Sequence, residues 1–160
     1  MVASLVYLAV QIRQNTRTVR GSTLHQNTDL WISVFLRLAE PSTARAYVAG
    51  MTASPDISPL HYTQFFFICR AMFLGYENQY YHVRQGVLDT ETYTAYQRSI
   101  SAQFLAFRGF PIWWQQSRSV FSPSFVGHID QMVANIPEAD PGVFLREWKE
   151  VTRPSVPAAQ

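Results

Sequence analysis

The chain has 160 residues, of which 48% are hydrophobic and only 15% are charged. This length suits one domain with a substantial core, and a formal net charge of +2 is too small to indicate a nucleic-acid-binding protein. In an average domain about a quarter of the residues are charged. We therefore expect a partner or a lipid surface to cover part of the surface of this domain.

The N-terminal segment predicts one long helix, over residues 2–39, that changes character twice. Residues 2–12 are almost wholly apolar, residues 13–23 form a polar collar, and a one-sided apolar stripe begins at Leu24. A core helix has no need of such a collar, whereas a helix that leaves a membrane does. We therefore expect residues 1–23 to be a membrane-proximal helix that precedes a folded domain.

Three arginines follow the apolar run at spacing i, i+4, i+7: Arg13, Arg17 and Arg20. They share one helix face, where basic residues attract an anionic leaflet and mark the cytoplasmic side of a membrane. The apolar run rises only about 17 Å, whereas the hydrocarbon layer measures roughly 30 Å. We interpret it as the remnant of an anchor that begins before Met1. The alternative is a solvated basic face on a cytoplasmic protein.

Capping residues and prolines divide the remaining chain into short helices. Ser58 and Ser122 each precede a proline, Asp89 precedes a helical pattern, and Gly86 and Gly109 suit helix ends. Short connections favour an antiparallel arrangement. The sequence predicts an all-α antiparallel bundle of five to six helices over residues 24–150, from which the N-terminal helix projects. Its segments are 42–50, 59–85, 90–108, a turn or short helix at 112–121, 123–135 and 141–150, followed by a disordered tail at 151–160.

Three stretches together resemble an uncharacterised bacterial family: SLVYLAVQIRQNTRTVR near the N-terminus, ENQYYHVRQGVLD at 77–89 and WWQQSRSVFSPSF at 113–125. Members of that family carry an N-terminal membrane helix that runs directly into a small cytoplasmic all-α domain. The resemblance therefore implies a place at the bacterial inner membrane, with the domain on the cytoplasmic side. It implies no activity.

Arg70, Glu77 and Arg84 recur at intervals of seven on the shoulder of the helix at 59–85. One interpretation is a ligand-binding pocket in which Glu77 accepts hydrogen bonds, an arginine binds an anion, and Asn78 and Tyr81 supply further polar groups. The alternative is a structural ion pair, with Glu77 bound to a cation from another helix such as Arg98 or His25.

Trp113 and Trp114 are adjacent, so we expect only one of them to face the core. The other would cover a seam or contact a protein partner or a membrane interface. The alternative is that both belong to a hydrophobic plug beneath the bundle. Cys69, the single cysteine, excludes an intrachain disulfide, and we expect a small buried side chain rather than a reactive thiol.

No sequence motif indicates a chemical reaction. The chain lacks a nucleophile elbow, a phosphate-binding loop and metal-ligand spacing, so we expect no enzyme activity, no metal and no cofactor. The hypothesis is a membrane-associated binding or scaffolding module whose partners are a lipid surface, another protein or a second copy of itself. The alternative is a soluble small-ligand-binding or sensor domain that uses the shoulder at Arg70 and Glu77.

Overall fold

The computed structural model describes residues 2–140 and 142–153, except for the side chains of residues 2–6, 9, 16, 17 and 144. The predicted tail lies outside this description from residue 154 on. The described chain is helical, which confirms the all-α prediction, but it contains seven α-helices rather than five or six. These are α1 (Val2–Leu38), α2 (Pro41–Met51), α3 (Pro59–Arg84), α4 (Thr90–Ile100), α5 (Gly109–Ser117), α6 (Pro123–Asn135) and α7 (Val143–Val151).

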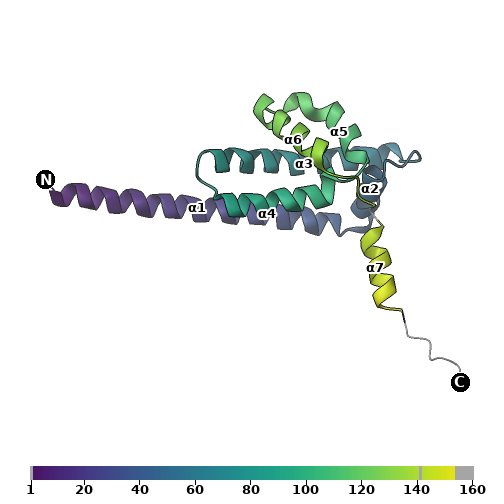
Figure 1. The fold of residues 1–160 in the computed structure, drawn as a ribbon, viewed down its shortest axis with the longest axis horizontal. Helices are drawn as coiled ribbons and strands as arrows, with labels where there is room; N and C mark the ends of the chain where they lie inside the picture. The colour runs from purple at the N-terminus through teal and green to yellow at the C-terminus, as the bar shows by residue number, and fades with distance from the viewer. Residues whose placement is uncertain (1, 141, 154–160) are drawn as a thin grey trace, which may run out of the picture.

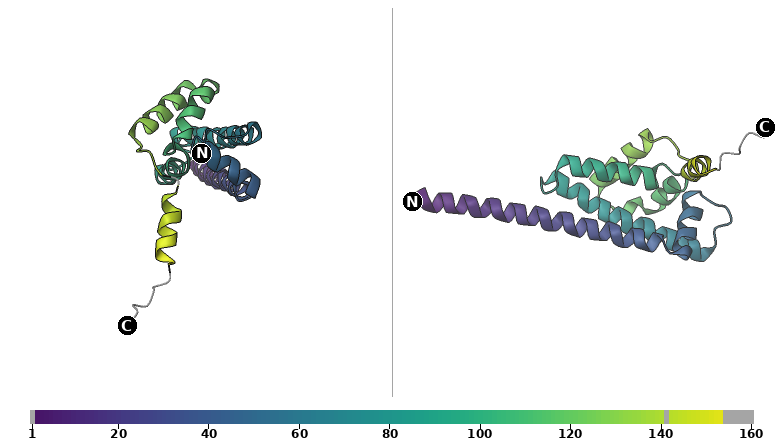
Figure 2. Two further views of the ribbon diagram at one scale, coloured as in Figure 1. Left: turned by 90° about the vertical axis from the view of Figure 1, so that its right-hand side faces the viewer. Right: turned by 90° about the horizontal axis from the view of Figure 1, so that it is seen from below.

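Helices α1, α3 and α4 lie side by side, and α5 and α6 lie together on one side of this group (Figure 1). The N-terminal half of α1 extends well beyond the domain, as Figure 2 also shows, and the predicted projecting helix is confirmed. Arg20 attaches α1 to the turn between α3 and α4, because its Nη2 donates a hydrogen bond to the carbonyl oxygen of Gly86 at 2.8 Å. Gly86 has φ of +69°, the left-handed conformation predicted for this helix end.

Aromatic rings fill the centre of the domain. Phe73 of α3 is fully buried, and its ring lies 4.8 Å from that of Phe110 and 6.0 Å from that of Phe104. Trp113 and Trp114 complete the cluster with exposed fractions of 1% and 2%. The expectation that one of them stays outside the core is therefore wrong.

The burial of both tryptophans follows from the place of α5 between two other helices. The ring of Trp113 contacts Phe66 and Phe73 of α3, whereas the ring of Trp114 contacts Phe125 of α6. The indole nitrogen of Trp114 donates to a carboxylate oxygen of Asp130 at 2.8 Å. The two rings also lie 6.1 Å apart and both contact Phe73, so they belong to one continuous aromatic core.

Local chemistry sets most helix ends where the sequence predicts them. The Ser58 hydroxyl accepts from the His61 backbone N–H, and the Asp89 carboxylate accepts from that of Thr92. Gly109 differs, because it begins α5 instead of ending a helix. A Cβ at this position would lie 1.8 Å from the carbonyl oxygen of Gly50, so only glycine permits this approach of α5 to α2.

The fourth helix also departs from the prediction, which ran it to residue 108. Regular α geometry ends at Ile100 and continues as a π-helical turn over Ser101–Leu105, where the Ala106 N–H donates to the carbonyl oxygen of Ser101. Such turns widen a helix locally and recur at functional sites.

The predicted membrane anchor needs correction. Within the described residues, no helix combines the length and the apolar content that a bilayer-spanning segment requires. The apolar run of α1 ends at Ile12, and the polar collar behind it is too hydrophilic to extend a span. The expected place at a bacterial inner membrane is therefore wrong for the chain that the structure describes.

Candidate functional site

Two of the five predicted shoulder residues hold the start of α6. Oε1 of Glu77 accepts a hydrogen bond from the Ser122 backbone N–H at 2.8 Å, and the guanidinium of Arg70 lies 5.2 Å from the centre of the Phe121 ring. A carboxylate at a helix N-terminus pairs an otherwise unsatisfied donor and interacts favourably with the helix dipole. Glu77 therefore binds neither Arg98 nor His25, and its partner is a backbone group.

The other three shoulder residues lie exposed on α3. Arg84 sits over the ring of Tyr80, 5.3 Å from its centre, and also lies 3.4 Å from the Tyr80 hydroxyl. Tyr81 packs against the same ring, and Asn78 is exposed. The structure thus brings Arg70 and Glu77 to one turn and leaves Asn78, Tyr81 and Arg84 outside it.

The predicted membrane-surface arginines are divided in the same way. Arg13 is exposed on the projecting part of α1, whereas Arg20 binds the Gly86 carbonyl of the domain. The Arg17 side chain is outside the described residues. Arg20 therefore contributes to the attachment of α1 and is not freely available to an external surface.

An open groove lies between α4 and α6, which run parallel at a constant sequence offset. The Tyr93 hydroxyl lies 2.9 Å from Nε2 of His128, and one turn later Gln97 meets the sulfur of Met132, so both pairs are 35 positions apart. The groove has a volume of about 770 Å³. Its lining consists of Thr94, Gln97, Arg98, Ser101, Ala102, Ala106, His128, Gln131, Met132, Asn135, Ile136, Pro137 and Ala139.

His128 closes one end of this groove among tyrosines. Its Nε2 is within 3.4 Å of the Tyr76 hydroxyl, and its ring stacks on that of Tyr80 with the centres 4.8 Å apart. Burial lowers the pKa of His128, so the imidazole is neutral at pH 7. Burial also raises the pKa of Tyr93 to about 12. The His128 imidazole and the Tyr93 hydroxyl are therefore both uncharged at neutral pH and interact as hydrogen-bonding groups.

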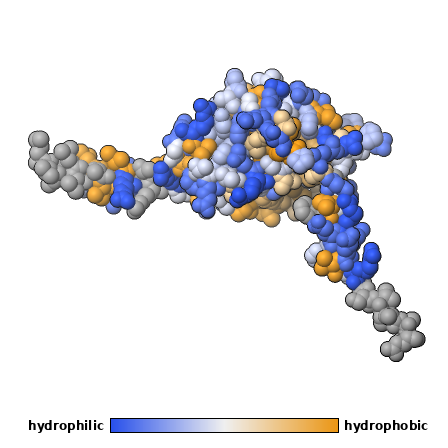
Figure 3. Space-filling model, in the orientation of Figure 1, coloured by the Kyte–Doolittle hydropathy of each residue, from blue (hydrophilic) through white to orange (hydrophobic). Residues whose placement is uncertain are grey.

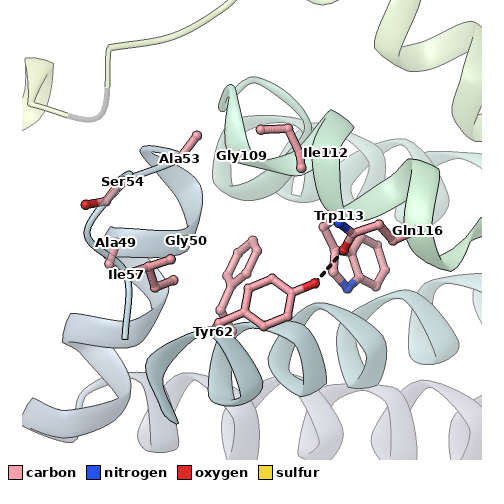
Figure 4. Close-up of a pocket in the computed structure, with 11 residues that line it drawn as sticks. Ala49, Gly50, Ala53, Ser54, Ile57, Tyr62, Gly109, Ile112, Trp113 and Gln116 are labelled. Atoms are coloured by element: carbon pink, nitrogen blue, oxygen red, sulfur yellow. Dashed lines mark hydrogen bonds between the residues drawn. The ribbon is translucent and has the colours of Figure 1, made fainter. Parts of the chain in front are cut away.

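A second, smaller pocket of about 150 Å³, partly open to solvent, lies between the end of α2, the start of α3 and α5 (Figure 4). The Tyr62 hydroxyl donates to the Gln116 side-chain oxygen at its edge. Ala53 lines it with φ of +50°, a left-handed conformation that is unusual for a residue with a Cβ. The pocket and the groove share no lining residue.

Reactive and metal-binding groups do not gather at either site. Cys69 is fully buried, which confirms the expected small buried side chain, and burial raises the pKa of its thiol. Within residues 2–140 and 142–153, no three His, Cys, Asp or Glu side chains are placed to hold a metal ion. His25 and Asp29 are 3.5 Å apart, on the exposed surface of α1.

Comparison with family models, curated proteins and solved structures finds no match to this chain. The likeness to an uncharacterised bacterial family therefore stays a prediction. Neither the groove nor the pocket was identified from the sequence. The 35-residue offset between α4 and α6 has no local signal, because it depends on how the intervening α5 packs. The apolar stripe of α7, by contrast, is visible in the sequence.

Proposed function

We propose that this chain is a non-enzymatic scaffolding module that self-associates by placing α7 of one copy in the α4–α6 groove of another. The observation that supports this proposal is the exposed apolar stripe of α7. Leu145, Trp148 and Val151 follow one another at i, i+3 and i+6, with exposed fractions of 57%, 69% and 86%. In Figure 3 the orange residues of α7 stand outside the domain, on a helix that points away from it.

A helix of this length needs a packing partner. α7 has nine residues, and isolated helices shorter than about 12–15 residues are marginal in water. Of the four tryptophans, three are at most 7% exposed, and Trp148 is the one that stands in solvent. A large aromatic side chain on an amphipathic helix is a typical anchor for a groove on a partner.

The dimensions of the groove fit such a helix. From His128 to Asn135 the eight residues of the α6 wall rise about 12 Å, and the nine residues of α7 rise about 14 Å. Met132, Ile136 and Ala106 offer apolar surface at the base of the groove. An amphipathic helix that inserts there buries the stripe against these side chains and leaves its polar face in water.

The charges of the two surfaces are complementary. Glu147 and Glu150 lie on one flank of the α7 stripe, and Arg146 and Lys149 lie on the other. Arg98, on the α4 wall, is the one formally charged residue that lines the groove. The acidic flank of α7 therefore suits the α4 wall. The basic flank then faces the C-terminal turn of α6, whose carbonyl groups carry a partial negative charge.

The connection before α7 favours exchange between copies over a return into the same groove. The Ala139 N–H donates to the Ala106 carbonyl at 2.7 Å, which fixes the chain at the end of the groove. Asp140 then accepts from the Gly142 N–H and pairs with Arg146 at 2.6 Å, a local turn that directs α7 outward. A short connection of this kind favours exchange of a terminal element between identical chains.

The experiment that tests this proposal is sedimentation equilibrium of the full chain. We expect a dimer that Trp148→Ser converts to a monomer without change in helix content. Leu60→Ser is the matched control, because Leu60 is 67% exposed on α3 and belongs neither to α7 nor to the lining of the groove. This variant should remain dimeric. A full chain that sediments as a monomer up to 100 μM would contradict the proposal, as would loss of the dimer in both variants.

A further inference from the structure

We propose that the π-helical turn after α4 determines which side chain the groove recognises, because it forms one wall of a slot that accepts Trp148 from a second copy. This inference rests on the proposed exchange of α7 and goes beyond it by assigning the anchor of that helix to one part of the groove. The turn comprises Ser101–Leu105, and the opposite wall of the slot is the C-terminal end of α6. The slot favours a large, mainly apolar aromatic ring on an amphipathic helix.

The π-helical turn changes which residues of this segment line the groove. In a regular α-helix Leu105 would follow Ser101 on the same face, because side chains four positions apart lie above one another. Here the Ala106 N–H reaches back five positions to the Ser101 carbonyl, and Ala106 is the next lining residue after Ala102. Phe104 and Leu105 are turned into the core, with exposed fractions of 0% and 4%. The turn thus places an alanine where a leucine would otherwise narrow the groove.

The size of the lining side chains differs along the groove. Toward His128 the lining is larger and polar, whereas at the π-helical turn it is small. The larger group is Thr94, Gln97, Arg98 and Gln131, and the small group is Ser101, Ala102, Ala106 and Ala139. The Ser101 hydroxyl donates to the Gln97 carbonyl at 2.7 Å, so this polar group is already paired and can be covered by an apolar ring. Room for an indole ring is therefore greatest at the turn.

The α6 wall of the slot offers apolar contact for such a ring. One turn beyond Gln97, the constant offset of 35 positions places Ser101 level with Ile136. Met132 and Ile136 are partly buried against the core. The Met132 sulfur lies 3.6 Å from the Tyr76 hydroxyl, and a thioether also makes favourable contacts with aromatic rings. An indole ring that enters the slot therefore exchanges water for apolar side chains on both of its faces.

The charges of the exchanged helix place Trp148 at the level of the slot. Glu147 and Glu150 lie within two positions of Trp148 in the sequence. The proposed exchange pairs this acidic flank with Arg98 on the α4 wall. Ala102 follows Arg98 by four positions, which is one helical turn or about 6 Å along the axis. The slot therefore lies within one turn of the point where the charges meet, within reach of the large Trp148 side chain.

The test exchanges bulk between the slot and the helix and measures dimerisation of the full chain by sedimentation equilibrium. Ala102→Trp fills the slot and should weaken the dimer at least about tenfold, whereas Ala102→Leu, a milder filling, should weaken it about threefold. Trp148→Ala removes the anchor and should also weaken the dimer at least about tenfold. The combined variant, Ala102→Trp with Trp148→Ala, restores the buried volume and should dimerise to within about threefold of the original chain. Ala95→Trp is the matched control and should dimerise like the original chain, because Ala95 is exposed on α4 and does not line the groove.

The outcomes separate this inference from the proposed function. If Trp148→Ala weakens the dimer but neither Ala102 variant does, Trp148 binds elsewhere, so the slot is overturned and the exchange of α7 stands. The slot is overturned in the same way if the combined variant does not recover the dimer, or if Ala95→Trp weakens it as much as Ala102→Trp. If the original chain does not dimerise, or if Trp148→Ala leaves the dimer unchanged, both the exchange and the slot are overturned.

Discussion

Helices α5 and α7 have the same length, nine residues, and opposite surroundings. In α5 both tryptophans are buried between α3 and α6, whereas in α7 Trp148 is 69% exposed. Neither helix is long enough to be stable alone. The comparison teaches that α5 finds its packing partners within the chain, whereas the apolar stripe of α7 stays exposed in the part of the chain that the structure describes. We infer that another molecule covers this stripe.

The largest effect should come from the contact that seats α5. Gly109→Ala places a Cβ 1.8 Å from the Gly50 carbonyl oxygen, so the backbone of α5 must move. We expect a loss of more than about 3 kcal/mol in the free energy of unfolding, measured by urea denaturation. In Gly127→Ala the new Cβ meets no atom within 4 Å, and that variant should gain about 0.5–1 kcal/mol. Equal stability of the two variants would contradict the close contact.

Two tryptophan variants test the difference between α5 and α7 directly. Trp114→Phe removes buried ring atoms and the hydrogen bond to Asp130, and should lower the free energy of unfolding by about 2–3 kcal/mol. Trp148→Phe, measured at a concentration where the chain is monomeric, should change it by less than about 0.5 kcal/mol. Similar losses in the two variants would mean that α7 packs on its own domain.

The N-termini of α6 and α7 offer a further test, with a smaller expected effect, of the difference between the domain and α7. Glu77 binds the first turn of α6 from another helix, whereas Asp140 binds only its own turn before α7. Glu77→Ala should destabilise the domain by about 1–2 kcal/mol in thermal or urea unfolding. Asp140→Ala should leave the unfolding midpoint of the domain unchanged. A ligand that raises the unfolding midpoint of the original chain but not that of Glu77→Ala would instead support the predicted ligand-binding pocket on the shoulder.

The smallest effect concerns pH and His128 at the end of the groove. Burial lowers its pKa from 6.5, so the folded protein favours the neutral imidazole and the unfolded chain binds a proton more readily. The contribution of His128 to stability is complete above pH 6.5 and is lost as the pH falls through its lowered pKa. The midpoint of urea unfolding should decrease over this window, and His128→Gln should flatten the profile. An unchanged profile in the variant would assign the effect to other groups.

Local chemistry made part of the fold predictable. The caps at Ser58 and Asp89 and the left-handed Gly86 depend on residues within a few positions, and each appears where the sequence placed it. The sequence left the burial of both Trp113 and Trp114 as an alternative only, because this burial requires two helices distant in sequence to enclose α5. Glu77 was recognised as a residue in need of a partner, yet a backbone N–H on α6 carries no signature in a sequence.

The candidate sites were less accessible to prediction for a related reason. The groove arises from the offset of α4 and α6, and the pocket from the approach of Gly109 to Gly50. Both are consequences of tertiary packing. The N-terminal segment shows the opposite error: its pattern of apolar run, collar and arginines was clear, but within the described residues no helix is long and apolar enough to span a membrane.

The most direct test of self-association through the groove is a charge swap, followed by sedimentation equilibrium. Arg98→Glu reverses the charge on the α4 wall and should weaken the dimer at least about tenfold, because it then opposes Glu147 and Glu150 of the inserted helix. Adding Glu147→Lys and Glu150→Lys to the same chain should restore the dimer. Unchanged association in Arg98→Glu, or failure of the combined variant to recover it, would contradict the placement of α7 in this groove.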